Sequence, residues 1–347
     1  MTLTRPREAA PISRAAAIPR PPSIAPIRGA LVIATFAAAC LAVSYSPVLV
    51  TRFGGSLATL GAAANYADSA ATVLGWLLAT AALFLGYLAA TELGGLRAGR
   101  VGLVVAMIGS VLLAVAGACA VWATQIQGRA SISGGALAFR KASSATREIQ
   151  NLSKAELAFT AAGFLVLGIG ALAARAASPS RRAEGATVAA AWRRAFLALG
   201  VGFVLAAVAP AYELVEIIRW PSSGLNQLYV LVTTVPPVLA WVAIAVGVLL
   251  AGSALRRSPR TSGLAVAGTI GAVGAFLVAV EYGTQVVFNQ YQLSSTSFGW
   301  STNLAKVGSA TVWAGWLLIT LAIGIAAARL TEHDVLARPA VTPLSVR

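Results

Sequence analysis

The sequence is poor in charged residues and in the side chains that most enzymes use for catalysis. Charged residues make up 11% of its 347 residues, whereas a soluble domain carries about 25%. It has one histidine, His333, in the C-terminal tail. A Ser–His intramembrane protease, a bis-histidine haem site and a zinc site like those of soluble metalloproteases all need histidine within the membrane, so all three are excluded.

Other catalytic arrangements are excluded by position. The only aspartates, Asp68 and Asp334, fall on opposite sides of the predicted membrane, which rules out a two-aspartate protease. No glycine-rich phosphate-binding loop with its lysine is present. Cys40 and Cys119 both lie inside apolar runs, so no external pair is available for a disulfide. We therefore predict no enzyme activity, no metal and no cofactor.

Long apolar runs are what the sequence does contain. Hydrophobic residues make up 58% of the chain, and about 20 apolar residues in a helix cross a hydrocarbon core roughly 30 Å thick. The runs are continuous and do not alternate, which favours helices over a β-barrel. They predict an all-α polytopic membrane protein with eight transmembrane helices, near residues 29–50, 69–91, 101–123, 157–177, 195–218, 228–252, 262–288 and 307–328.

The net charge of +15 follows membrane topology and does not indicate nucleic-acid binding. Of the 26 Lys and Arg residues, 18 lie in the two tails and the connections on the same side as those tails. Both termini are therefore predicted to be cytoplasmic. The Ala- and Arg-rich composition suggests the inner membrane of a bacterium. The basic cytoplasmic loops would attract anionic lipids at about 1 kcal/mol per residue near the surface.

The apolar runs form two sets of four with the same rhythm of loops and turns. Gly102 and Gly263 begin similar segments, and so do Thr124 and Thr284 near the outer ends. An even number of spans in each set predicts a 4+4 internal repeat in which both halves have the same orientation. The predicted parts are a disordered basic Pro-rich tail (1–28), repeat 1 (29–178), a cytoplasmic linker (179–193), repeat 2 (194–328) and a second tail (329–347).

Acidic residues within membrane spans are the usual indication of a functional site. Repeat 2 carries several polar residues near the outer ends of its first and third spans, whereas repeat 1 has no acidic residue at the corresponding positions. These residues form a candidate polar vestibule for a cation or a polar solute; a local Glu–Arg pair or simple exposure at the interface is the alternative. They are Glu213, Glu216, Arg219, Glu281, Tyr282 and Gln285.

A pair of prolines, Pro236 and Pro237, lies in the middle of the sixth span and follows Thr233 and Thr234. Proline lacks a backbone donor and clashes with the preceding turn, so a kink or a break is expected here. Broken helices near the bilayer midplane are frequent in transporter sites, and they are also common as purely structural kinks.

Two functional hypotheses remain from the sequence. The first is a permease-like facilitator that moves a small solute or ion between the two halves. The second is a non-catalytic membrane subunit or scaffold, whose tails and charged 124–154 loop would contact protein partners. The duplication and the Pro-Pro pair favour transport, and the lack of charge at the midplane argues against a proton-coupled pump.

Overall fold

The computed structural model describes residues 25–46, 57–92, 97–132, 137–176, 183–219, 227–256, 262–294 and 298–330. Regular structure within these ranges is entirely α-helical. Eight helices are long and apolar enough to cross a membrane, as the sequence predicts. The chain is therefore a multi-pass membrane protein. The helices are α1 (Ala25–Ser44), α3 (Leu57–Glu92), α4 (Arg97–Ile132), α5 (Leu137–Arg175), α6 (Ala183–Arg219), α7 (Gln227–Arg256), α8 (Ser262–Ser294) and α9 (Phe298–Arg329).

Several helices are longer than a membrane span requires. Helix α5 has 39 residues, which corresponds to about 58 Å at ~1.5 Å per residue, whereas the hydrocarbon core is roughly 30 Å thick. Most of the predicted 124–154 loop is therefore helical, in the end of α4 and the start of α5. The predicted 179–193 linker is likewise mostly helix, because α6 begins at Ala183. The helical parts of both segments contain several alanines and lack proline, so they favour helix over loop. The predicted tails lie almost wholly outside the described residues.

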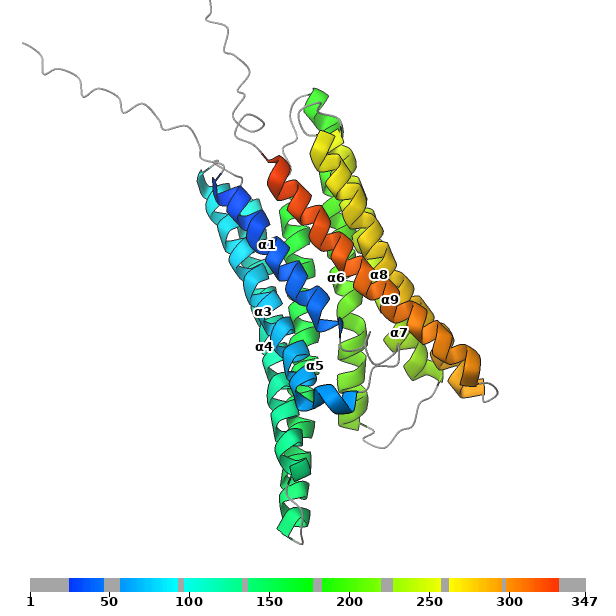
Figure 1. The fold of residues 1–347 in the computed structure, drawn as a ribbon. Helices are drawn as coiled ribbons and strands as arrows, with labels where there is room; N and C mark the ends of the chain where they lie inside the picture. The colour runs from blue at the N-terminus through cyan, green and yellow to red at the C-terminus, as the bar shows by residue number, and fades with distance from the viewer. Residues whose placement is uncertain are drawn as a thin grey trace, which may run out of the picture.

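The eight helices form a closed ring. Each helix packs against the one before it and the one after it, and α1 packs against α9 to complete the circle. In Figure 1 the start of α1 and the end of α9 lie at the same end of the bundle, while the α4–α5 hairpin projects beyond the opposite end. The ring thus encloses an interior that all eight helices border.

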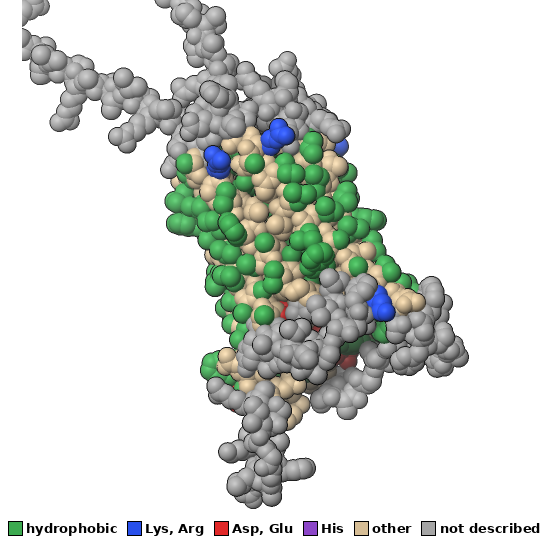
Figure 2. Space-filling view, viewed as in Figure 1, with side chains coloured by type: hydrophobic (Ala, Val, Ile, Leu, Met, Phe, Trp, Pro, Cys, Tyr) green, Lys and Arg blue, Asp and Glu red, His purple; other side chains and the backbone are tan. Residues whose placement is uncertain are grey.

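The outer surface of the ring is apolar. Figure 2 shows a broad band of hydrophobic side chains across the face of the bundle, with basic side chains near its ends. Phe36 is 61% exposed, and Leu228 and Phe276 are also exposed. Such a continuous apolar surface is what contact with lipid tails requires.

Glycines let pairs of helices approach closely, as expected where apolar burial between helices gains little. Gly109 of α4 lies against Gly163 of α5, and a Cβ at Gly109 would be 2.8 Å from the carbonyl oxygen of Gly163. Gly274 of α8 and Gly315 of α9 repeat this arrangement, with the corresponding distance at 2.7 Å. At both crossings the two backbones are in direct contact.

The two crossings match in detail. Leu113 packs on Gly163 in the first half, as Val278 packs on Gly315 in the second. The sequence separation between Leu113 and Val278 is the same as that between Gly109 and Gly274. This alignment of α4 with α8 differs from the one in which Gly102 corresponds to Gly263. Short Ala- and Gly-rich segments of membrane helices can be aligned with one another in more than one way.

Candidate functional site

Aromatic side chains occupy the interior of the helix ring at equivalent places in its two halves. Trp76 of α3 packs edge-on against Phe164 of α5, with ring centroids 6.2 Å apart at 83°. Trp241 of α7 packs edge-on against Trp316 of α9, at 5.5 Å and 84°. Each pair joins two helices that have one helix between them in the ring, so the contacts lie on the inner side. We call these four residues the aromatic layer.

Two tyrosines extend the aromatic layer, in the second half, toward the end of the bundle opposite the start of α1. Tyr45, directly after α1, stacks on Trp316 with ring centroids 6.3 Å apart at 21°. The phenol of Tyr282 on α8 interacts with both Tyr45 and Trp241. Asp68 of α3 acts electrostatically on Tyr45. Residues from α7, α8 and α9 and the residue that follows α1 therefore meet in one region.

Glu281 is the best-defined member of the predicted vestibule. The side-chain amide of Gln285 donates a hydrogen bond to Glu281 Oε1 at 2.9 Å. The other carboxylate oxygen points toward α9, where Gly308 faces it, and Thr284 lies beside the same glycine. The absence of a side chain at Gly308 leaves room for this carboxylate between α8 and α9.

Glu213 and Glu216 belong to a second group, built by α5, α6 and α7. Tyr212 packs against Tyr229 of α7 with ring centroids 6.2 Å apart, and its phenol interacts with Glu216. Glu213 acts electrostatically on Tyr229. Arg219 is exposed in the last turn of α6, where a cation interacts favourably with the helix dipole. The described contacts thus place five of the six predicted vestibule residues in two groups, and they do not join Arg219 to either.

Glu156 of α5 is a site residue that sequence reasoning does not single out. Its carboxylate interacts electrostatically with Glu213 and with Cys119 of α4. It lies about two helical turns from Gly163, on the α5 face that packs against α4. The spacing of Glu156 from Gly163 is the sequence signal that could have identified it as a site residue. Because the charged Lys154 lies just before it, however, this segment resembles a loop.

The positions of Glu156 and Glu281 are related. In the register of the glycine crossings, Glu156 corresponds to Gly308, and Glu281 corresponds to Ala116 of α4, which is 4% exposed. Each half therefore has one carboxylate and one small residue at this level of the crossing. In the first half the carboxylate is on the second helix of the pair, α5, and in the second half it is on the first helix, α8.

The Pro-Pro pair does not interrupt its helix: α7 is assigned as one continuous helix over Gln227–Arg256. Because prolines supply no donor, the carbonyls of Val232 and Thr233 lose their usual helical partners. The hydroxyl of Thr233 donates to the carbonyl of Tyr229 at 2.8 Å, and that of Thr234 donates to Val230. The two threonine hydroxyls do not replace these donors, since they bond carbonyls closer to the start of the helix. Thr234 and Pro237 are buried. A kink within this helix stays a prediction.

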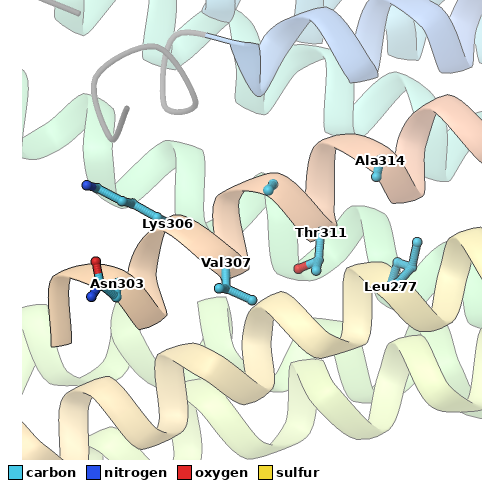
Figure 3. Close-up of a pocket in the computed structure, with 7 residues that line it drawn as sticks. Leu277, Asn303, Lys306, Val307, Thr311 and Ala314 are labelled. Atoms are coloured by element: carbon cyan, nitrogen blue, oxygen red, sulfur yellow. The ribbon is translucent and has the colours of Figure 1, made fainter. Parts of the chain in front are cut away.

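An open groove of about 540 Å³ lies at the surface between α8 and α9. Figure 3 shows Val307 and Thr311 directed toward α8, with Lys306 and Asn303 nearer the start of α9. The groove is almost entirely apolar, and its lining includes Leu277 of α8. Among the side chains that the structure describes, no three His, Cys, Asp or Glu residues are grouped to hold a metal ion.

Comparisons with known proteins assign no function to this site. No protein family matches the chain. No curated protein and no solved structure matches it at a significant level either. The arrangement of side chains within the ring is therefore the basis for any function, because a fold alone does not define one.

Proposed function

We propose that the protein is a permease-like facilitator of a small solute. The observation that carries this proposal is the closed ring of helices, since α1 packs against α9 and every helix borders the interior. Transporters place substrate sites between the two halves of a repeated helical unit. The interior contacts of Tyr45 and Tyr282 with residues of several helices support such a site.

The proposed pathway narrows from the outer end inward. Glu156 and Glu281 lie at the same level near the outer end. The aromatic layer lies about 12 Å deeper along the helices, at ~1.5 Å per residue. The aromatic layer is the proposed constriction, and the carboxylates form the vestibule outside it. Close to this layer the described parts of α3, α5, α7 and α9 carry no charged side chain, which fits a facilitator better than a proton-coupled pump.

The pathway lies between two halves that arose by duplication in the same orientation. The matching crossings of Gly109 with Gly163 and of Gly274 with Gly315 support the 4+4 repeat. The paired edge-on contacts of the aromatic layer support it independently. The sequence separation between equivalent residues changes once, between the α4/α8 pair and the α5/α9 pair. The longer α4–α5 hairpin of the first half accounts for this change.

Orientation follows from the basic residues. Both termini lie on the cytoplasmic side of a bacterial inner membrane, with the α4–α5 hairpin outside. Cysteine labelling tests this with R97C near the inner end and T146C near the outer end, in a C40A/C119A background. An impermeant maleimide added to intact cells is expected to label only T146C. Labelling of R97C instead would reverse the orientation.

Transport is tested with purified protein in liposomes. Uptake of radiolabelled sorbitol reports a polar solute, and translocation of a short-chain fluorescent phosphatidylcholine reports an amphipathic one. Movement of either probe above the rate in protein-free vesicles supports the proposal, provided that the E213Q/E216Q/E281Q triple variant is slower. Wild-type rates equal to those of empty vesicles for both probes would overturn it, and so would a fully active triple variant.

A second candidate function is that of a membrane subunit, which the projecting α4–α5 hairpin favours. This hairpin extends beyond the rest of the ring in Figure 1, and Arg147 and Glu148 are exposed on it. A photo-crosslinker at position 147 tests for a protein partner within 124–154. A specific adduct that is lost on shortening the hairpin supports a subunit. Absence of any adduct in cells counts against it.

A further inference from the structure

The contact between α1 and α9 differs from the other contacts of the ring. Among the described helices, every other extensive contact joins two helices that follow one another in the chain. The α1–α9 contact alone joins the two ends, so no connecting segment holds these helices together. It is also the least extensive of the eight contacts. We call it the α1–α9 seam.

Packing at the seam is also looser than on the opposite side of the ring. There, α5 crosses α6 at Gly168 and Gly200, and a Cβ at Gly168 would be 2.8 Å from Val204 Cγ2 and 3.0 Å from the Gly200 carbonyl oxygen. At the seam, a Cβ at Gly324 would be 3.6 Å from Thr35 Cγ2, which is ordinary van der Waals contact. The halves therefore have a tight contact at α5–α6 and a loose one at the seam.

The seam separates lipid from the aromatic interior. On its inner side Tyr45 stacks on Trp316. On its outer side α1 and α9 expose apolar side chains, including Phe36 at 61% and Leu321 at 52%. Separating α1 from α9 would connect the bilayer directly to Trp316. Among the described residues no ion pair is seen across this seam, so its opening would break van der Waals and aromatic contacts together with the polar contacts of the Tyr45 phenol.

We propose that the ring opens along the α1–α9 seam, with the α5–α6 crossing as the hinge, and that the transported solute is amphipathic and enters from the bilayer. This inference rests on the proposed facilitator function. An aromatic or aliphatic body suits the surface formed by Tyr45 and Trp316, since aromatic rings bury large apolar area in such contacts. The polar end of the solute would then lie toward the outer end, near Tyr282 and Glu281.

The experiment locks the seam with a disulfide. In the C40A/C119A background, T35C and G324C place two cysteines across the seam, where a Cβ at position 324 would be in van der Waals contact with the Thr35 side chain. The matched control, T80C/S110C, links α3 to α4 inside the first half, where the two hydroxyl oxygens are 2.8 Å apart. The probe is the short-chain fluorescent phosphatidylcholine in liposomes.

Oxidation is expected to reduce translocation by T35C/G324C to the rate of protein-free vesicles, and reduction is expected to restore it. The oxidised T80C/S110C variant should keep its activity. If the oxidised seam variant moves the probe like the reduced protein, seam opening is refuted while the facilitator function stands. If the wild type moves sorbitol but not the lipid probe, the inference of an amphipathic solute is refuted.

A distance measurement tests seam opening without any transport. Spin labels at Phe36 and Leu321 flank the seam, and labels at Leu77 and Ile108 flank the α3–α4 contact; all four side chains are at least half exposed. Pulsed EPR in liposomes should give a second, longer distance for the seam pair and one distance for the control pair. A single narrow distance at the seam would contradict the inference, even if the protein transports neither probe.

Discussion

Gly308 of α9 faces the carboxylate of Glu281 on α8 so closely that a Cβ at position 308 would occupy the place of the carboxylate oxygen. The small residue and the acid are thus one arrangement built from two helices. Charged groups within a membrane are costly unless they are accommodated by polar partners. Here Gln285 supplies a hydrogen bond, and Gly308 supplies the space.

The first prediction concerns this pair. G308A should displace Glu281 and destabilise the protein by about 1–3 kcal/mol, as overpacking of a filled site does. G283A on α8 is the matched control, because a Cβ there would meet nothing within 4 Å. Thermal unfolding in detergent measures both variants. Equal stability of G308A and G283A would show that Glu281 is not held as described.

The second prediction tests the equivalence of the two halves. G109A and G274A each place a Cβ within 3 Å of a carbonyl oxygen on the facing helix. Each should lower the free energy of unfolding by a similar amount, about 1–3 kcal/mol. G86A is the control, since its Cβ would contact nothing. A large loss for one variant and none for the other would contradict matched crossings.

The third prediction concerns a polar contact that the second half lacks. Thr80 of α3 and Ser110 of α4 form a hydrogen bond of 2.8 Å, whereas the register of the crossings places Ala245 and Ala275 at these positions in the second half. A double-mutant cycle with T80A and S110A should give a coupling of about 0.6 kcal/mol, the average for such contacts in membranes. T72A is the control, because Thr72 bonds only within its own helix. Strictly additive losses would argue against the contact.

The fourth prediction separates a site acid from a surface acid on the same helix. E156Q should slow translocation by about tenfold, which corresponds to ~1.4 kcal/mol, because Glu156 lies at the level of Glu281 in the opposite half. E148Q should leave the rate unchanged, since Glu148 is exposed on the projecting part of α5. Liposome flux at matched protein density measures both. Similar rates for E156Q and E148Q would remove Glu156 from the site.

The number of spans could be predicted from the sequence because each span is a continuous apolar run, and lipid accepts helices of that length. Their ends could be predicted only in part. The sequence allows a helix that begins at Leu137, and it is present, whereas nothing in the sequence predicts that α6 begins as early as Ala183. Helix propensity there acts without any apolar signal. The closure of the ring could not be predicted either, because a contact between α1 and α9 produces no pattern in the sequence of either helix.

The candidate site was predicted only in part. Glu281 and Gln285 could be paired from their spacing along one helix, and their hydrogen bond is present. Glu156 was missed because its importance depends on α4, a different element. Trp76 and Trp316 illustrate the same point: each stands in an ordinary apolar run, and its edge-on partner is visible only once the helices are placed.

The seam has a consequence for biosynthesis. Helix α1 is made first and its partner α9 last, and a ribosome adding about 5–20 residues per second needs roughly 15–60 s to produce the intervening chain. Throughout that time the α9-facing side of α1 has no protein to cover it. The nascent protein must either leave Thr35 and Tyr45 in contact with lipid or shield them with an insertion factor until α9 arrives.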